Sequence, residues 1–307
     1  MVTPYAGYWA TAWLLALLSG GLARLMGQRP WRAAGLGLMT VPLWTTGIDI
    51  GLSIAPLVQG GTVLQAASRR ALSDQAIGAI LVNLGYLGAG FLVYATDGRV
   101  LSKDLRGLAR ELASVVPLWR NEGASAAAGL AVTPLLALGF TLLVMLTQGI
   151  RVLNNGDDSQ YFTNMTLYHA VLISAAAALG EELLFRGLLQ GLLARGLVGL
   201  GRGAATTVAI VLQAIVFGFA HAGYGNFSHV LFPAVFGLLA GFLSWRFGLW
   251  SAIVLHFLAD FYQFGLEAGT QVAWVSWLVQ ALFLLNIAFS IVWVAAMWRR
   301  RRVRAGE

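Results

Sequence analysis

Apolar residues dominate this chain in long runs, and polar residues gather in the short segments between the runs. A helix needs about 20 apolar residues to cross a bilayer. Nine runs come close to that length, at about 8–25, 33–57, 76–95, 126–145, 167–189, 204–222, 227–245, 249–265 and 272–298. If one of these runs is re-entrant, eight spans remain. The pattern predicts an all-α polytopic membrane protein, a bundle of eight or nine transmembrane helices.

The composition supports a membrane protein rather than a soluble one. Of the 307 residues, 58% are hydrophobic and 11% are charged, whereas soluble domains carry about 25% charged residues. A soluble fold could not hide so much apolar surface from water. The chain contains no cysteine, which excludes disulfides, thiolate metal sites and cysteine nucleophiles.

The formal net charge of +7 comes from arginines at the ends of apolar runs. This distribution sets the orientation of a membrane protein, so we expect no nucleic-acid partner. With the basic segment 299–304 in the cytoplasm, the other basic loops fall mostly on the same side, and Arg69 and Arg70 are exceptions. The positive-inside bias thus predicts a cytoplasmic C-terminus. The residue usage, rich in alanine, glycine and arginine, suggests that the membrane is a bacterial cytoplasmic (inner) membrane.

The intramembrane polar residues divide the chain into three predicted parts. We expect N-terminal transmembrane helices over 1–150, with a basic amphipathic cytoplasmic segment near 97–122. A solvated connecting helix explains that segment equally well. A helical core over 157–266 holds nearly all the intramembrane polar groups, and 267–307 forms a last transmembrane helix and a basic cytoplasmic tail.

The first polar cluster in the apolar region contains Glu181, Glu182 and Arg186. Insertion scales put a charged side chain at a bilayer centre at roughly +2.5 to +3.5 kcal/mol, so such groups usually face a partner charge or a water-filled cavity. On an α-helix Glu182 and Arg186 share a face and can pair. Glu181 is rotated about 100° away, which predicts that it is the free carboxylate. A buried ion pair that only fixes helix register is the structural alternative.

Two further clusters contain histidine. Phe217 precedes His221 by four residues, and His256 precedes Asp260 by four. The second spacing puts the imidazole and the carboxylate on one helix face, about 6 Å apart along the axis. There they can bind a common metal or water, or the carboxylate can orient the ring. Packing alone also explains an isolated His221, and a self-satisfied pair explains His256 and Asp260.

Together these groups make a set for general-base and electrophilic catalysis. Burial favours the neutral form of a carboxyl group, so a carboxylate in a low-dielectric site can accept a proton from water near pH 7. The histidines could bind a metal, hold the water or donate a hydrogen bond to an oxyanion. No competing nucleophile is evident, because Ser244 and Ser251 lack a suitable adjacent base.

The ordered motifs Glu-Glu-x-x-x-Arg, Phe-x-x-x-His and His-x-x-x-Asp resemble the CPBP family. This family comprises the CAAX prenyl endopeptidases and the bacteriocin-processing (Abi) intramembrane proteases. The resemblance covers about 167–264 and implies a catalytic core within 157–266, with a polar cavity inside the helix bundle. It also implies hydrolysis of a peptide bond by an activated water. The implied catalytic residues are Glu181 as general base, His221 on the water, and His256 and Asp260 at the oxyanion or a metal; Glu182 and Arg186 are implied supporting residues.

Asp260 departs from the eukaryotic prenyl proteases, which tend to have asparagine at this position. A carboxylate cannot donate a hydrogen bond to an oxyanion, so Asp260 must be protonated, ligate a metal or orient His256. A Zn²⁺ ion held by Glu181, His221 and His256 is compatible with these residues, and so is a metal-free glutamate mechanism.

The expected partners are membrane lipids and a membrane-associated or hydrophobic protein or peptide substrate. The oligomeric state is open. Two other functions stay possible at this point. One is a proton-coupled transporter in which the same groups relay protons, and the other is a non-catalytic immunity or scaffold protein of the same fold.

Overall fold

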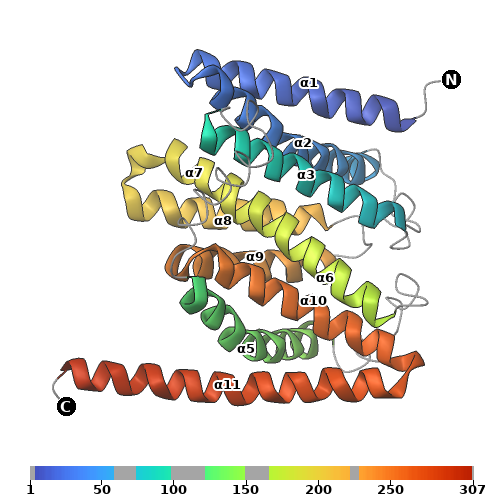
Figure 1. Cartoon of the computed structure of the whole chain (residues 1–307), viewed down its shortest axis with the longest axis vertical. Coiled ribbons are helices and arrows are strands. Elements are labelled where there is room, and N and C mark those ends of the chain that lie inside the picture. The colour runs from blue at the N-terminus through green and yellow to red at the C-terminus, as the bar shows by residue number, and fades with distance from the viewer. Residues whose placement is uncertain (1–3, 59–73, 98–121, 149–165, 222–227, 306–307) are drawn as a thin grey trace, which may run out of the picture. The chain divides into compact units, whose positions relative to one another are not determined.

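The structure is a computed structural model that describes residues 4–58, 74–97, 122–148, 166–221 and 228–305 (Figure 1). Its elements there are helices, and these residues form no strand. In chain order they are α1 (Pro4–Leu25), α2 (Pro30–Val58), α3 (Asp74–Thr96), α5 (Glu122–Gln148), α6 (Leu167–Glu182), the π-helix η6 (Leu183–Leu189), α7 (Gln190–Gly196), the 3₁₀-helix η7 (Val198–Leu200), α8 (Arg202–Ala220), α9 (Ser228–Phe247), α10 (Leu249–Gln271) and α11 (Ala273–Ala305).

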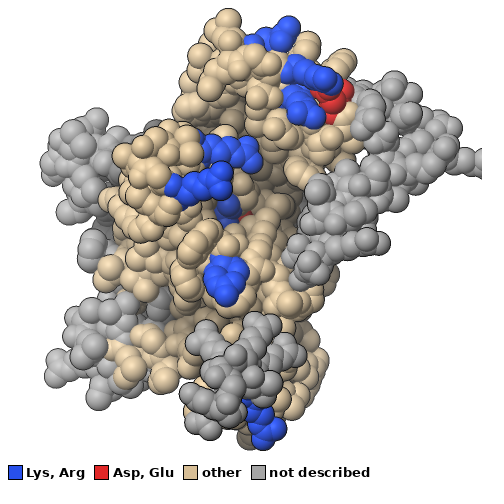
Figure 2. All heavy atoms as spheres, turned by 90° about the vertical axis from the view of Figure 1, so that its left-hand side faces the viewer, with Lys and Arg blue, Asp and Glu red and all other residues tan. Residues whose placement is uncertain are grey.

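Each predicted apolar run falls on a helix, so the all-α polytopic fold is confirmed. Within the described ranges, four helices are long and apolar enough to cross a membrane, namely Arg202–Ala220, Val230–Phe247, Leu249–Thr270 and Ala273–Arg299. Large apolar side chains point outward, such as Trp277 at 71% exposure and Leu285 at 66%. The face drawn in Figure 2 is mainly uncharged, and the charged side chains visible on it are mostly basic. Such a surface suits lipid, and the chain is an integral membrane protein.

The helices form two compact units, which are described separately. The first unit comprises residues 1–68, 78–121 and 183–237. Its helices α2 and α3 cross at two glycines, where a Cβ atom on Gly35 would lie 2.6 Å from the carbonyl oxygen of Gly90. Only glycine permits this backbone contact, which is the usual way that transmembrane helices approach closely.

The second unit comprises residues 69–77, 122–182 and 238–307. Its helix α10 packs against α5, α6 and α11 (Figure 1). A cluster of buried apolar side chains joins α6, α10 and α11, and it consists of Ala170, Ile173, Phe261, Phe264, Ala268, Val275 and Val279. Three neighbours therefore enclose α10, and polar side chains on its buried faces need partners within the protein.

The predicted division at 1–150, 157–266 and 267–307 follows the order of the chain and stays a prediction. The compact units group helices by contact instead, so that α5 packs with α10 and α11. The predicted amphipathic segment near 97–122 lies outside the described residues except at its two ends, Asp97 and Glu122.

Candidate active site

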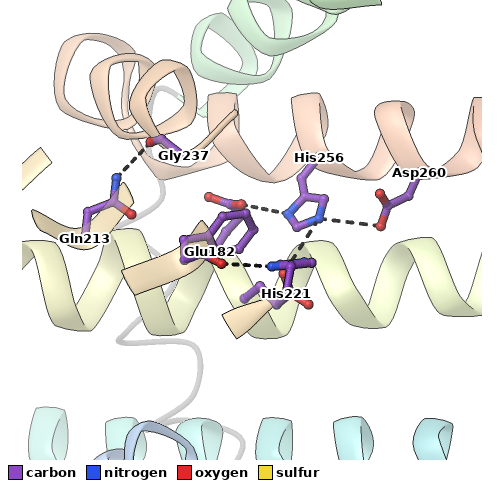
Figure 3. Close-up of polar contacts among 8 residues, drawn as sticks. Glu182, Gln213, His221, Gly237, His256 and Asp260 are labelled. Atoms are coloured by element: carbon purple, nitrogen blue, oxygen red, sulfur yellow. Dashed lines mark hydrogen bonds and ion pairs between the residues drawn. The ribbon is translucent and has the colours of Figure 1, made fainter. Parts of the chain in front are cut away.

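A short hydrogen bond joins α6 to α10 in the second unit. The Nδ1 atom of His256 lies 2.7 Å from Oε1 of Glu182 (Figure 3). Both side chains are buried, with Glu182 at 0% exposure and His256 at 5%. Because a carboxylate only accepts hydrogen bonds, the proton of this bond sits on Nδ1 of His256. Glu182 therefore sets the orientation of the ring, as carboxylates do for functional histidines.

The other ring nitrogen of His256 faces two more carboxyl groups. Its Nε2 atom lies 3.5 Å from Oδ2 of Asp260 and 3.9 Å from Oε2 of Glu181. The predicted i, i+4 pair of His256 and Asp260 therefore shares one face of α10. However, Asp260 is not the side chain that makes the short bond to the ring, because Glu182 does so from another helix. His256 thus bridges three acidic side chains, two of them on α6.

The two adjacent glutamates differ in exposure. The side chain of Glu181 is 32% exposed and that of Asp260 is 23% exposed, whereas the Glu182 side chain is fully buried. The predicted division of roles, with chemistry at Glu181 and structural support from Glu182, is compatible with this difference and stays a prediction. The prediction that Glu181 is a free carboxylate is wrong, because it lies close to His256. Its three-dimensional neighbour is 75 residues away along the chain, so local spacing could not reveal the contact.

A π-helix begins directly after the two glutamates. The segment η6 covers Leu183–Leu189 and contains Arg186. π-Helical turns are rare and are frequently found at functional sites. The expectation of one regular α-helix over 167–189 is therefore wrong from Leu183 onward. The pairing of Glu182 with Arg186 stays a prediction, and α-helical spacing by itself no longer supports it.

In the first unit, Arg186 packs on aromatic rings. Its guanidinium carbon lies 4.3 Å from the centre of the Phe217 ring and 5.4 Å from that of Phe236, and the residue is 3% exposed. Phe185 also packs edge-on against Phe217, with ring centroids 4.9 Å apart. Guanidinium groups stack well on aromatic faces, so Arg186 and Phe217 stabilise each other. Arg186, a predicted supporting residue, thus contacts an aromatic side chain that lies outside the Glu-Glu-x-x-x-Arg motif.

A buried glutamine fastens α8 to α9 beside this arginine. The Nε2 atom of Gln213 donates to the carbonyl oxygen of Gly237 at 2.8 Å (Figure 3), and Gln213 is 0% exposed. At Gly237 a Cβ atom would lie 3.4 Å from Nη2 of Arg186. Sequence reasoning missed Gln213, and its only local signal is a lone amide within an apolar helix.

His221 ends α8 at its C-cap position. Its Nδ1 atom lies 2.9 Å from the carbonyl oxygen of Phe217, and the two rings pack with centroids 4.7 Å apart. A carbonyl only accepts hydrogen bonds, so Nδ1 carries the proton and Nε2 of the neutral ring is an acceptor. Phe217 therefore supports Arg186 with its ring and orients His221 with its backbone, which explains the spacing of the Phe-x-x-x-His motif.

The second unit thus brings Glu181, Glu182, His256 and Asp260 together, while Arg186 and His221 belong to the first unit. All of these residues lie within a segment, 163–262, that matches the family model described as type II CAAX prenyl endopeptidase Rce1-like. This match confirms the resemblance over about a third of the chain, which we call the Rce1-like segment. No curated protein and no solved structure matches the chain.

Glu181, His221 and His256 of the Rce1-like segment are the predicted zinc ligands. Among the residues that the structure describes, no group of three or more His, Asp or Glu side chains is placed to hold a metal ion. His256 bonds to Glu182 through Nδ1, so Nε2 is the ring atom that could bind a metal. Metal-binding histidines commonly donate their other ring N–H to a carboxylate in this way. Zinc at Glu181, His221 and His256 stays a prediction.

Proposed function

We propose that this protein is an intramembrane endopeptidase that hydrolyses a peptide bond of a membrane-associated or hydrophobic substrate. The observation that carries the proposal is the contact of Glu181, at 3.9 Å, with a buried His256 whose orientation is set by Glu182. The contact lies within the Rce1-like segment. An accessible carboxylate beside an oriented imidazole is the minimum needed for general-base catalysis with electrostatic support.

In the proposed reaction Glu181 is the general base. It takes a proton from a water molecule, whose oxygen attacks the carbonyl carbon of the substrate, and it later gives that proton to the leaving amine. A positioned general base contributes about 10²–10⁴ in rate. The resemblance implies His221 on the water, and the Nε2 atom of its neutral ring can accept a hydrogen bond from a water O–H.

His256 is the proposed donor to the oxyanion. Glu182 holds Nδ1, so a second proton on the ring sits on Nε2, the atom that faces Glu181 and Asp260. This doubly protonated ring can donate to the negative oxygen of the tetrahedral intermediate, and Asp260 balances its charge. Removing one oxyanion donor costs about 10²–10³ in kcat. In this mechanism the Asp260 carboxylate does not need to donate a hydrogen bond to the oxyanion.

The test is cleavage of a membrane-associated peptide substrate by the full chain in proteoliposomes. Glu181→Gln should reduce kcat by about 10²–10⁴ and leave folding intact. The matched control is Glu267→Gln, which removes a carboxylate from α10 outside the cluster and should keep normal turnover. If both Glu181→Gln and His256→Ala retain normal cleavage, the proposal is refuted.

One observation favours a second candidate function. Glu181, His256 and Asp260 form a row of titratable groups, with successive contacts of 3.9 and 3.5 Å, and such rows relay protons in transporters. Uptake into proteoliposomes that follows an imposed pH gradient, without any proteolysis, would support that function. Proteolysis that is lost in Glu181→Gln would exclude it as the main activity.

A further inference from the structure

Helix α5 precedes the Rce1-like segment and yet supplies the cap of the helix that carries His256. Helix α10 begins after Gly248, which has φ +100° and no side chain to cap the first turn. Ser125 of α5 takes this role. Its Oγ accepts the N–H of Ser251 at 2.9 Å and donates to the carbonyl of Gly248 at 3.0 Å, an oxygen that also accepts from the Ser251 hydroxyl. The exposed N–H groups at a helix start need such a partner.

One turn further along, the backbones of α5 and α10 touch. A Cβ atom on Gly129 would collide with the carbonyl oxygen of Ser251 and lie 3.1 Å from the nitrogen of Leu255. Leu255 is the residue before His256. The backbone of α5 at Gly129 therefore contacts the turn of α10 that carries the proposed catalytic imidazole, because glycine has no side chain to hold the two helices apart.

A third contact involves a proline. Pro134 has no N–H, so the carbonyl of Leu130 loses its normal partner four residues on in α5. Asn286 of α11 donates to this carbonyl from Nδ2 at 2.6 Å. The Oδ1 atom of the same amide accepts from the hydroxyl of Tyr262 on α10, at 3.2 Å. Tyr262 also lies within 3.4 Å of the Leu282 carbonyl oxygen. Asn286 is 4% exposed, so this bridge is shielded from solvent.

We infer that Ser125 and Asn286 are positioning residues of this endopeptidase, an inference that rests on the proposed function. Together they hold α10 at 248–251 and at Tyr262, on either side of His256 and Asp260. They fix how far α10 slides and turns, and so the direction of the His256 ring toward α6. A misplacement of about 1 Å can cost 10²-fold in rate. The functional unit then extends beyond the Rce1-like segment to α5 and α11.

The deciding experiment separates positioning from stability. Asn286→Leu should lower kcat by about tenfold to a hundredfold with KM unchanged, and it should lower the thermal midpoint because the Leu130 carbonyl loses its donor. Adding Pro134→Ala restores an N–H for that carbonyl inside α5. The double variant should recover the thermal midpoint but keep the low kcat, because Tyr262 of α10 still lacks its hydrogen bond to position 286. Recovery of kcat together with stability would refute positioning.

The serine contact gives an independent test with a matched control. Ser125→Ala should also lower kcat, whereas Ser290→Ala should not, because the Ser290 hydroxyl bonds to the Asn286 carbonyl within its own helix, α11. Equal effects of the two substitutions would overturn the role of Ser125.

A structural readout keeps this inference separate from the proposed function. The chain has no cysteine, so spin labels can be placed at Val171 on α6 and Leu266 on α10, two exposed positions. The distance distribution between them should broaden in Ser125→Ala and Asn286→Leu and stay narrow in Ser290→Ala. Unchanged distributions in all variants would refute the inference even if wild-type protein cleaves substrate. Broadening in a protein that cleaves nothing would uphold the positioning of α10 and refute the endopeptidase.

Discussion

Replacing Glu182 with glutamine should reduce activity while the protein stays folded. The sequence alone predicts a structural role for Glu182, with Glu181 carrying the chemistry. In the structure Glu182 is also the acceptor for Nδ1 of His256 at 2.7 Å, with 0% of its side chain exposed. Glutamine keeps the size of the side chain but can turn its NH₂ group toward Nδ1. The ring would then carry its proton on Nε2 alone, with Nδ1 as an acceptor.

The expected magnitude follows from this single contact. Changing the carboxylate that orients a histidine into an amide costs about 10⁴ in kcat where the histidine is the proton-transfer group. Here His256 is the proposed oxyanion donor, and its Nε2–H is kept in Glu182→Gln, so the variant loses the positive charge of the donor and not the donor itself. Losing a donor outright costs about 10²–10³ in kcat, and a charge-assisted hydrogen bond is about twice as strong as a neutral one. We therefore expect kcat of Glu182→Gln to fall by about tenfold to thirtyfold. Stability should fall by about 1 kcal/mol, because a neutral hydrogen bond replaces a charged one. Glu182→Ala should cost about 3–5 kcal/mol, because it leaves the ring buried without its partner.

The assay combines turnover, denaturation and histidine spectroscopy on the same preparations. The protein has four histidines, so ¹⁵N-labelled histidine gives a spectrum simple enough to assign His256 by substitution. The wild-type spectrum should report a proton on Nδ1 of His256, and that signal should change in Glu182→Gln. Normal turnover in Glu182→Gln, together with an altered His256 signal, would refute the role of ring orientation in catalysis. An unaltered signal would refute the tautomer assignment itself.

Three other outcomes are expected. Phe217→Leu should cost about 0.5–2 kcal/mol of stability through the lost stacking of Arg186, and calorimetry in detergent should show a smaller loss for Phe242→Leu, which removes a ring from the exposed side of α9. Treatment with 1,10-phenanthroline should leave turnover unchanged under the metal-free mechanism; a loss that Zn²⁺ restores would instead support the predicted zinc site. His221→Gln should lower kcat and leave the thermal midpoint nearly unchanged. Turnover equal to that of the wild type would show that His221 has no part in the mechanism.

Much of the fold is predictable from the sequence, for a reason specific to membranes. In lipid, backbone N–H and C=O groups need partners within the protein, and a helix supplies nearly all of them from its own segment, so an apolar run of about 20 residues predicts a helix. The long run near 272–298 accordingly becomes α11, and the other runs become helices in the same way. Local spacing also suffices for His256 and Asp260, because residues four apart on a helix share a face.

The tertiary structure decided the relations that depend on how helices pack. Small residues permit many close helix crossings, and no local pattern says which crossing forms. Only the packed chain shows that His256 bonds to Glu182 across 74 residues of sequence. The same holds for the hydrogen bond from Asn286 to the Leu130 carbonyl, whose usual donor is missing because residue 134 is proline. The π-helix after Glu182 departs from the α-helical geometry that the run predicts. The sequence by itself therefore determined which residues are costly to bury, and the packing of the helices decided which partner each of them has.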